Sequence, residues 1–381
     1  MELLFWLSAI SIIYIYIGYP VLLSFLAKII RQKTSSEGGP LPEVSLIIAA
    51  HNEEAVIQQK IENCLNLEYP REKVEIIVVS DYSTDQTDEI VSDFACQGVR
   101  LISTESRLGK TGAQNEAAGK ARGEFLVFSD ANSLWEKEAL KKLVYPFTDE
   151  SVGYTCGQLR YTNPTEGNSS YSEGIYWRYE IFIRRLETAT GSITAGNGAI
   201  YAVRARDYHY FGNTQSHDFE YPHYVNSKGK KAVYINDAVA YEKAGIKTSE
   251  EYKRKVRMLA RVWGSILKSP GIFSPFHTNL LFSWKMISHR LLRYLAPLPQ
   301  VLIFASNIAL YPTALTYQIL LVVQIIFYSL ALLSSVFQFR PKIFYLPYYF
   351  CMFNFASMAG LAKTIFGRTP AYWEKAGSTR I

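Results

Sequence analysis

The sequence contains few cysteines and lacks the short motifs of several common enzyme classes. Its four cysteines are scattered over 381 residues without a C-x-x-C pair, so neither a zinc site nor a disulfide framework is indicated. This usage is typical of a reducing, cytosolic setting. The six histidines show no H-E-x-x-H spacing, and no G-x-S-x-G or G-x-x-x-x-G-K-[ST] pattern occurs. The missing motifs argue against a serine hydrolase and a P-loop nucleotidase.

A strong charge of one sign is also lacking. The formal net charge of +6 is small for a chain of 381 residues, and no basic stripe is interleaved with aromatic residues. We therefore expect no nucleic-acid partner.

What the chain does have is long apolar runs at both ends. Residues 3–30 contain one ionisable side chain other than tyrosine, Lys28, and the run exceeds the ~20 residues that a membrane helix needs. A cleaved signal peptide is the competing interpretation, but the run starts beside the acidic Glu2 and is longer than a signal-peptide core. We predict an uncleaved transmembrane helix over residues 1–30.

Three more apolar stretches lie near residues 294–312, 316–338 and 343–362. The first carries Pro297 and Pro299, which indicate a kink or a position in the membrane interface. Basic residues flank the N-terminal run and also fill the tail, and both sets favour the cytoplasmic side, so one of the three stretches should not span. The proline-bearing stretch is our candidate. The basic residues are Lys28, Arg31 and Lys33 at the flank, and Lys363, Arg368, Lys375 and Arg380 in the tail.

These patterns divide the chain into five predicted parts. They are a transmembrane helix (1–30), a linker rich in Ser, Gly and Pro (31–43), a soluble domain (44–275), membrane-associated and transmembrane helices (276–366) and a basic tail (367–381). We expect a multi-pass protein of the cell inner (plasma) membrane that touches membrane lipids and whose soluble domain is cytoplasmic.

Within the soluble domain, short β-branched runs alternate with helix-like stretches. Such runs are typical of strands that are buried on both faces of a parallel sheet. The alternation predicts a doubly wound α/β sheet, which a second group of elements should complete while shaping an acceptor site. The first strands are expected at 44–50, 74–80, 99–103 and 124–129, with helices near 53–66, 86–95 and 109–121; the second group comprises strands near 152–160 and 199–204 and an amphipathic helix over 170–187.

Polar residues follow the strands at once, and the carboxyl ends of parallel strands form a ligand-binding edge. Asn52 and Glu54, after the first strand, either start a helix or contact the base or ribose of a nucleotide. Asp81 lies at the tip of the second strand, where we expect no helix for it to cap. Binding of a base or a ribose hydroxyl is therefore the favoured interpretation of Asp81.

A metal and a diphosphate are predicted at the same edge. Asp130, in Asp130-Ala-Asn132, closes a buried strand, which is costly for an acid without a partner. A divalent ion that bridges two phosphates, Mg²⁺ or Mn²⁺, would be such a partner. Lys110 follows a glycine at a helix start and suits a diphosphate, although an exposed loop lysine explains that motif alone as well.

Two further segments are candidates for the acceptor side. Gly196-Asn197-Gly198 either makes a turn or offers a flat surface to a sugar ring. Asp218 either caps a helix or acts as the general base that removes the acceptor hydroxyl's proton, with Glu220 as the fallback.

A basic helix precedes the C-terminal membrane region. Arg254 and Arg257 lie on one side of it, where they would attract anionic lipid heads or clamp a pyrophosphate. Both roles can hold together.

Taken in order, these segments resemble glycosyltransferase family 2, a group of inverting enzymes with the GT-A fold, over about residues 42–270. The matching stretches are VSLIIAAHNEE, VVSDYSTDQT, RLGKTGAQN, FLVFSDAN, GNGAIYAVR, HDFE and RKVR. The membrane flanks are similar to the branch that makes bacterial exopolysaccharides, capsules and lipid-linked glycans. The resemblance implies a GT-A (Rossmann-like) mixed-sheet domain flanked by transmembrane helices.

The resemblance also implies roles for individual residues. Asp81, with Asn52 and Glu54, would hold the nucleoside, and Asp130 would lie at the diphosphate and metal. Asp218 would be the base, and Arg254 and Arg257 would close over the diphosphate.

The sequence departs from the family pattern at three places. Asn132 replaces the second metal carboxylate, and His217 replaces the Glu before the base. The Q-x-x-R-W of processive synthases is absent. These departures favour addition of one or a few sugars over long-chain polymerisation.

The sequence thus predicts an inverting glycosyltransferase that moves a sugar from a nucleotide sugar, with a UDP-sugar expected, to a lipid-linked or polysaccharide hydroxyl at the cytosolic membrane face. Assembly with other polysaccharide biosynthesis proteins is compatible with it. The alternatives are a non-catalytic membrane scaffold of a polysaccharide assembly complex, motivated by Asn132 and His217, and a nucleotidyltransferase, in which Asp218 would have no clear task. A transporter is disfavoured because the apolar segments lack ionisable groups that would form a pathway.

Overall fold

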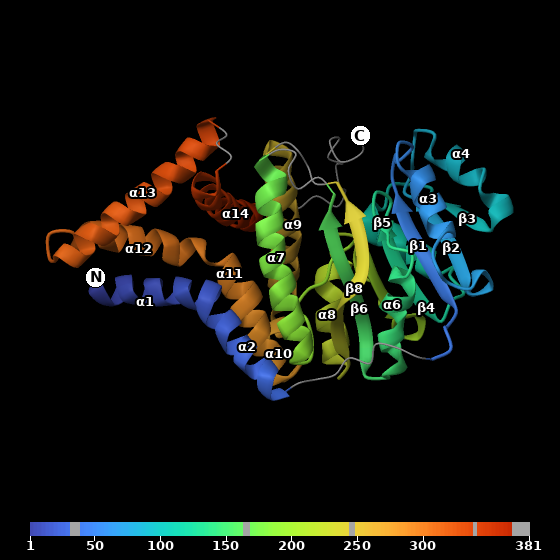
Figure 1. Ribbon diagram of the computed structural model, residues 1–381, viewed down its shortest axis with the longest axis horizontal. Coiled ribbons are helices and arrows are strands. Elements are labelled where there is room, and N and C mark those ends of the chain that lie inside the picture. The colour runs from blue at the N-terminus through green and yellow to red at the C-terminus, as the bar shows by residue number, and fades with distance from the viewer. Residues whose placement is uncertain (31–38, 163–167, 244–247, 338–340, 368–381) are drawn as a thin grey trace.

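The computed structural model describes residues 1–30, 39–162, 168–243, 248–337 and 341–367. Most of the predicted linker and almost all of the predicted tail lie outside the described residues, as do Arg31, Lys33, Arg368, Lys375 and Arg380. The described chain forms an α/β domain, with helices from both ends of the chain gathered at one side of it (Figure 1).

A mixed sheet of eight strands forms the centre of the domain, in the order β3-β2-β1-β4-β7-β6-β8-β5. Strand β1 pairs in parallel with β2 and β4, and β2 pairs in parallel with β3. The predicted α/β fold with a mixed sheet is confirmed, and the first four predicted strands are present within one residue of their expected bounds. The strands are β1 (Val44–Ala50), β2 (Val74–Ser80), β3 (Val99–Ser103), β4 (Phe125–Asp130), β5 (Leu134–Trp135), β6 (Val152–Tyr161), β7 (Ile200–Arg204) and β8 (Lys231–Glu242).

The second half of the sheet is not doubly wound. Strand β7 is antiparallel to both β4 and β6, whereas β8 is parallel to β6 and antiparallel to β5. The sequence patterns did not predict β5, β8 or helix α6 (Ala139–Val144). In β8 the polar pair Asn236 and Asp237 interrupts the strand pattern where the pairing register with β6 shifts.

Helices cover both faces of the sheet because side chains alternate along each strand. On β1, Leu46 and Ile48 pack into the core beneath α3, α4 and α6, whereas Ile47 and Ala49 pack into the core beneath α5, α7 and α8. The predicted helices are present but shorter at their ends, except α7, which is longer. Their bounds are α3 (Ile57–Leu65), α4 (Thr87–Ser92), α5 (Gly109–Ala118), α7 (Asn168–Ala189), α8 (His217–Ser227) and α9 (Thr248–Lys268).

Helix α7 joins the domain to the chain ends through buried charges. Its Glu187 is fully buried and accepts hydrogen bonds from the Tyr19 hydroxyl at 2.8 Å and from the Thr194 backbone N–H at 2.9 Å. The His289 ring lies 2.8 Å from the same carboxylate, and Arg293 pairs with the buried Glu180, about two helical turns earlier in α7. These contacts fix the N-terminal helix and the segment after residue 280 against the domain.

Two helices among the described residues are long and apolar enough to cross a membrane. One spans Glu2–Ile30 and consists of α1 (Glu2–Ile13), a π-helical turn (Tyr14–Gly18) and α2 (Tyr19–Ile30); the other is α13 (Leu315–Phe337). The proline-bearing stretch forms α12 (Pro297–Leu310), which bends by 56° from the segment Leu280–Tyr294; together these two form a broken span or a re-entrant loop. The predicted kink is therefore present.

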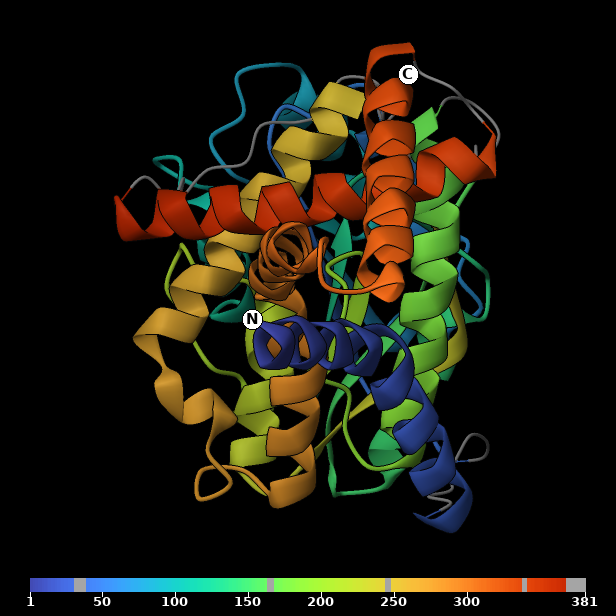
Figure 2. The same cartoon turned by 90° about the vertical axis from the view of Figure 1, so that its left-hand side faces the viewer.

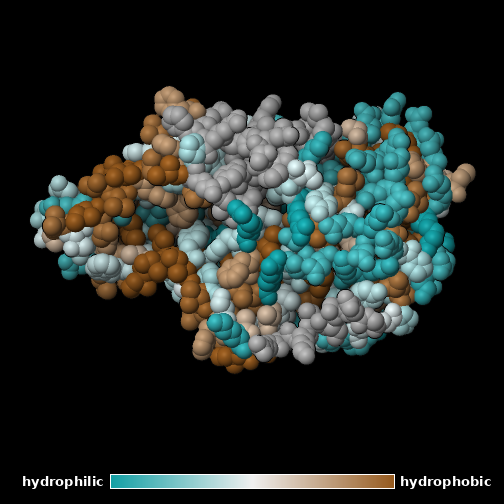
Figure 3. All heavy atoms as spheres, viewed as in Figure 1, coloured by the Kyte–Doolittle hydropathy of each residue, from teal (hydrophilic) through white to brown (hydrophobic). Residues whose placement is uncertain are grey.

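Helix α14 (Lys342–Ile365), which holds the third C-terminal stretch, does not meet the same requirement of length and hydropathy. It crosses α9 beside the domain (Figure 2), and the Trp263 indole N–H donates to the Ser357 carbonyl at 3.2 Å. Apolar side chains are concentrated at the end of the molecule formed by α1, α12 and α13, and hydrophilic ones at the β1–β3 end (Figure 3).

The start of β4 depends on Gly123. A Cβ at this residue would lie 2.4 Å from the Ser45 backbone N and 2.5 Å from the Val44 carbonyl carbon, so strand β1 would have to move. We expect Gly123→Ala to lower the free energy of unfolding by about 1–3 kcal/mol, which is the usual cost of overpacking. Thermal unfolding of the purified protein in detergent measures it. Gly119→Ala is the control, since its Cβ would meet only an ordinary contact at 3.6 Å; equal unfolding midpoints for the two variants would contradict the expectation.

Candidate active site

A cleft of about 480 Å³ opens at the carboxyl ends of β1 and β4, between α5, α9 and the segment that precedes β7. It brings together nine of the twelve predicted site residues from five regions of the chain. They are Lys110, Asp130, Asn132, Gly196, Asn197, Gly198, Asp218, Arg254 and Arg257. The other three, Asn52, Glu54 and Asp81, lie in the neighbouring loops after β1 and β2 and do not line it.

Asp130 and Lys110 form an ion pair inside the cleft. The Lys110 ammonium contacts the Asp130 carboxylate and also donates to the Gly198 carbonyl at 3.1 Å. The sequence predicted separate roles for them, one at a metal and one at a diphosphate; in the ligand-free cleft each neutralises the other. Among the described residues no group of three or more His, Cys, Asp or Glu side chains could hold a metal ion.

The turn after Asp130 is supported by Lys60, which the sequence did not predict. The Lys60 side chain is fully buried, its ammonium donates to the Ser133 carbonyl at 2.6 Å, and it lies 4.8 Å from the centre of the Trp135 ring. Burial lowers the pKa of Lys60. This contact fixes the backbone on which Asp130 and Asn132 stand.

The structure gives Asp81 a capping role that the sequence did not predict. It is fully buried, and its two carboxylate oxygens accept hydrogen bonds from the backbone N–H groups of Leu108 at 2.6 Å and Gly109 at 2.9 Å. Asp81 therefore caps the start of α5, a helix that follows it only after β3. We missed this capping because the two segments are 27 residues apart in sequence.

The loops after β1 and β2 are tied together by side-chain contacts with the backbone. Asn52 accepts from the Thr84 N–H at 2.7 Å, and Glu54 accepts from the Gln86 N–H at 3.0 Å. Asn52 and Tyr82 both have positive φ, at 53° and 57°. A bulky residue such as Tyr82 adopts this left-handed conformation only where the surroundings impose it, which is common near functional sites.

The segment Gly196-Asn197-Gly198 is a rigid wall of the cleft. The Asn197 side chain donates to the Gly157 carbonyl at 2.7 Å and accepts from the N–H groups of Ala199 and Ile200 at 3.1 Å each. The Gly196 N–H donates to the Asp218 carbonyl at 2.7 Å. The wall and the predicted base are therefore held together by the backbone.

Asp218 lies at the start of α8 and borders the cleft, where its carboxylate accepts from the Ser216 hydroxyl. Glu220, the fallback base, does not line the cleft; it is buried and accepts from the Gln215 amide at 3.1 Å. Burial raises the pKa of Glu220. The geometry favours Asp218 of the two.

His217 borders the cleft beside Asp218 and is a neutral group. It is buried, and its Nδ1 lies 2.8 Å from the Tyr201 hydroxyl, while its Nε2 has no hydrogen-bond partner among the described residues. Burial, with a further contribution from the Lys110 charge, lowers the pKa of His217 to about 3. His217 therefore cannot replace the negative charge of a glutamate at this position.

Helix α9 carries the predicted diphosphate clamp. The Arg254 guanidinium donates to both oxygens of Glu251, at 2.8 and 3.2 Å, and Lys255 pairs with the same carboxylate at 3.1 Å. Burial raises the pKa of Glu251, but the charges of Arg254 and Lys255 outweigh it and lower the pKa to about 2. An ionised Glu251 thus orients Arg254 along the cleft wall.

The structure adds cleft residues that motif analysis missed. Arg184 and Trp177 reach the cleft from α7, and Arg184 donates to the Gly196 carbonyl at 2.7 Å. The available signal was the helical spacing of Trp177, Ile181, Arg184 and Thr188, which places an arginine on the buried stripe of α7.

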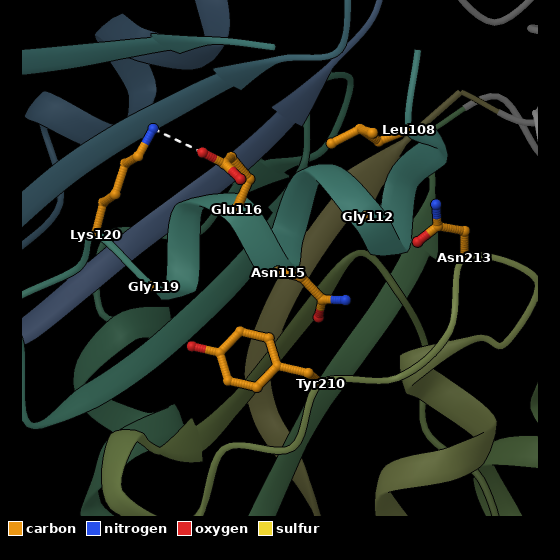
Figure 4. Close-up of a pocket in the computed structure, with 8 residues that line it drawn as sticks. All are labelled: Leu108, Gly112, Asn115, Glu116, Gly119, Lys120, Tyr210 and Asn213. Carbon is orange, nitrogen blue, oxygen red and sulfur yellow. Dashed lines mark ion pairs between the residues drawn. The ribbon is translucent and has the colours of Figure 1, made fainter. Parts of the chain in front are cut away.

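A second hollow of about 380 Å³ lies on the outer side of α5 and contains none of the predicted site residues. Tyr210 and Asn213 face α5 there, and Glu116 and Lys120 form an ion pair at 2.7 Å along the helix (Figure 4). We therefore place the candidate active site in the larger cleft.

Gly196 and Gly198 differ in the space that the structure leaves for a side chain. A Cβ on Gly196 would lie 2.0 Å from the hydroxyl of Tyr154, whose buried ring stacks between Tyr201 and Tyr221, whereas one on Gly198 would meet only the flexible end of Lys110 at 2.7 Å. We expect Gly196→Ala to lower the unfolding midpoint well below that of the wild type, and Gly198→Ala to leave it nearly unchanged. Thermal unfolding compares them, and a larger loss for Gly198→Ala would refute this account of the wall.

His217 gives a pH dependence of stability with a defined sign. In the unfolded chain its pKa returns to about 6.5, so between pH 6.5 and about 3 the unfolded state binds the extra proton and stability falls as the pH falls. The wild type should lose about 1 kcal/mol more stability between pH 7.5 and 5.5 than His217→Gln does. Chemical unfolding at both pH values measures the difference. The exposed His277→Gln variant should keep the wild-type dependence, and an unchanged slope in His217→Gln would disprove the assignment.

Part of the chain is similar to proteins of a known family. Residues 45–211 match the family described as glycosyl transferase family 2. The probable glycosyltransferase YdaM of Bacillus subtilis is 37% identical over 129 residues, which are 32% of this chain and 31% of that protein. A beta-monoglucosyldiacylglycerol synthase of Nostoc is 32% identical over 175 residues, 44% of this chain and 37% of that one. The poly-beta-1,6-N-acetyl-D-glucosamine synthase of Staphylococcus epidermidis is 27% identical, with 43% and 40% covered.

The chain therefore spans only 31–40% of the length of these relatives. Among solved structures, the mannosyltransferase PcManGT of Pyrobaculum calidifontis, in complex with GDP-Man and Mn²⁺, superposes with a TM-score of 0.72 at 21% identity and covers 95% of this chain and 99% of that one. This likeness establishes a shared fold. Residues 45–211 of the chain thus match the glycosyl transferase family 2 model, and the fold is GT-A.

Proposed function

We propose that this protein is a membrane-anchored inverting glycosyltransferase that moves a sugar from a nucleotide sugar to a hydroxyl of a lipid-linked or polysaccharide acceptor. The observation that carries the proposal is the convergence of Asp218, Asp130 and three basic residues on one cleft at the carboxyl edge of the sheet. The family domain and the names of the relatives support it.

The donor would lie across the edge formed by β1, β2 and β4. Asn52, Glu54 and Asp81 would shape the nucleoside end, although the carboxylate of Asp81 already accepts two backbone hydrogen bonds, so it would act mainly by fixing the turn before α5. Lys110, Arg254 and Arg257 would meet the diphosphate, which suits the guanidinium fork and the helix start at Gly109.

Asp218 would take the proton of the acceptor hydroxyl, whose oxygen attacks the anomeric carbon as the bond to the diphosphate breaks. Inversion follows from a single displacement. Two relatives are named for β-linked products, which such a displacement yields from an α-linked nucleotide sugar.

The cleft residues can supply only part of the ligand set of a divalent cation. Asp130 and Asn132 supply two side-chain oxygens, so phosphate oxygens and water would have to complete the shell that Mg²⁺ or Mn²⁺ requires. When bound, the ion would neutralise charge on the diphosphate. Arrival of the donor would let Lys110 leave Asp130 for a phosphate, since both side chains are partly exposed, by 24% and 30%.

The membrane arrangement supports an acceptor supplied from the bilayer. The apolar helices Glu2–Ile30 and α13 flank the domain, and α7 contacts both the cleft and the N-terminal helix. We propose a multi-pass protein of the plasma membrane with the domain on its cytosolic side, in contact with lipids and with other polysaccharide biosynthesis proteins.

The nucleotide of the donor can be decided by experiment. A UDP-sugar is our proposal, whereas the solved structure of similar fold holds GDP-Man. Release of nucleoside diphosphate should be measured for a panel of UDP-, GDP-, CDP- and ADP-sugars in membranes that contain the protein, with and without Mn²⁺. We expect UDP release that rises with the metal. Release of pyrophosphate instead would favour a nucleotidyltransferase.

Asp218→Asn tests the base. Loss of a positioned general base should lower transfer about 10²–10⁴-fold, while binding of nucleoside diphosphate stays within about twofold because Asp218 would not contact the nucleotide. Asp237→Asn, on the exposed bulge of β8, is the matched control and should transfer at the wild-type rate. Wild-type transfer by Asp218→Asn would exclude this mechanism and favour the scaffold alternative.

A further inference from the structure

Arg184 is a buried cation in the cleft wall, and no described residue is an acidic partner for it. Its side chain is 4% exposed, and one guanidinium nitrogen, Nη2, donates to the Gly196 carbonyl at 2.7 Å. Within the described residues the other two nitrogens, Nε and Nη1, have no hydrogen-bond partner, and no carboxylate forms an ion pair with them. The Trp177 ring lies beside the guanidinium, 4.9 Å from its carbon.

The other buried arginines of the described chain are compensated. Arg204 pairs with Glu150 at 3.4 Å, Arg290 with Glu180 at 3.8 Å, and Arg293 with the same Glu180. Burial of a charge is costly unless it is paired. Arg184 lacks such a pair, which indicates that a group from outside the chain supplies the compensating negative charge.

The polar neighbours of Arg184 cannot supply the missing charge. Burial raises the pKa of the Cys156 thiol to about 11 and that of the Tyr234 hydroxyl above its usual range, and Arg184 only partly opposes these shifts. The hydroxyls of Tyr154 and Tyr234 also have no hydrogen-bond partner among the described residues. Among the described residues no carboxylate forms an ion pair with Arg184, so this end of the cleft offers donors and positive charge to a ligand.

The position of Arg184 assigns it to the acceptor side. Two cations bracket the segment Gly196–Gly198: Lys110 donates to the Gly198 carbonyl and is neutralised by Asp130, whereas Arg184 donates to the Gly196 carbonyl. The N–H of Gly196 donates to the carbonyl of Asp218. Arg184 is thus linked through one residue to the proposed base.

We propose that Arg184 binds an anionic group of the acceptor, a phosphate or a carboxylate, and holds the acceptor hydroxyl beside Asp218. The assignment rests on the proposed function for its acceptor side. It makes Arg184 a determinant of acceptor class: acceptors that carry an oxyanion near the reacting hydroxyl are preferred to neutral ones. Helix α7 also packs against the N-terminal apolar helix through Glu187 and Tyr19, so the helix that carries Arg184 lies next to a candidate membrane span.

Binding of simple oxyanions tests the site without the natural acceptor. The full-length protein in nanodiscs is first saturated with UDP and Mn²⁺, or with the nucleotide found to bind, so that the diphosphate region is filled. Inorganic phosphate and D-glucuronate are then titrated against wild type, Arg184→Gln and Arg184→Lys. We expect Arg184→Gln to weaken binding at least tenfold, and Arg184→Lys to recover part of it because the charge returns.

Arg185→Gln is the matched control. Arg185 is the next residue of α7, is exposed, and contacts Asn236 away from the cleft, so its loss should leave oxyanion binding unchanged. Unfolding midpoints of the variants show whether the fold is kept; if Arg184→Gln does not fold, Arg184→Lys against Arg185→Lys provides the comparison. Equal binding by wild type and the Arg184 variants, or no binding of either oxyanion to the wild type, would overturn the proposal.

Transfer assays then identify the source of the anion. Nanodiscs with phosphatidylglycerol are compared with nanodiscs that contain neutral diacylglycerol, and soluble glucuronate is compared with glucose, each by release of nucleoside diphosphate. A preference for phosphatidylglycerol that is lost in Arg184→Gln supports a lipid as the source of the anion. A preference for glucuronate that is lost in the same variant supports a soluble acceptor. An equal loss on charged and neutral acceptors would reduce Arg184 to a positioning residue for Gly196. Failure of nucleotide binding in the wild type would instead count against the proposed function.

Discussion

The buried carboxylate of Glu187 on α7 is the contact on which the arrangement of membrane helices and cleft depends. It accepts from Tyr19 of the N-terminal helix and from the backbone of Thr194, and it lies beside His289 of the C-terminal segment. Burial alone would raise its pKa, but His289 and the neighbouring cations Arg290 and Lys285 lower it to about 2, so the group is ionised. Loss of one partner from such a cluster typically costs about 3–5 kcal/mol, because a charge remains buried without compensation.

The same cluster is connected to the cleft wall by a hydrogen bond. The Arg290 guanidinium donates to the Thr194 hydroxyl at 2.9 Å, two residues before the wall formed by Gly196–Gly198. The wall is in turn bonded to Asp218 and Arg184. The helices at the chain ends and the cleft wall therefore share one set of hydrogen bonds, so a rearrangement of the helices after residue 280 would displace the wall beside Asp218.

Two ion pairs lie in the cleft. Lys110 opposes Asp130, and Arg254 opposes Glu251. Asn132 and the neutral His217 remove two negative charges that the family pattern would place nearby. Fewer carboxylates therefore repel one another in the cleft.

The sequence by itself determined the parallel half of the sheet, the apolar ends and nine of the residues that line the cleft. Strands β1 to β4 are continuous β-branched runs, and a parallel topology sends their carboxyl ends to one edge, so Asp130 could be placed from local pattern alone. Gly196 and Asp218 could be chosen because their short motifs have an order along the chain.

Only the tertiary structure decided what these side chains touch. The capping of α5 by Asp81, the pairing of Lys110 with Asp130 and the support from Lys60 join residues 20–73 positions apart. Strand β8 was not predicted for the same reason, because its polar bulge interrupts the alternation of a strand. Arg184 was not predicted because the buried stripe of α7 is similar to that of any amphipathic helix. Local periodicity reports which face of an element is buried, whereas the partner on that face depends on contacts between distant segments, and these form only when the chain has folded.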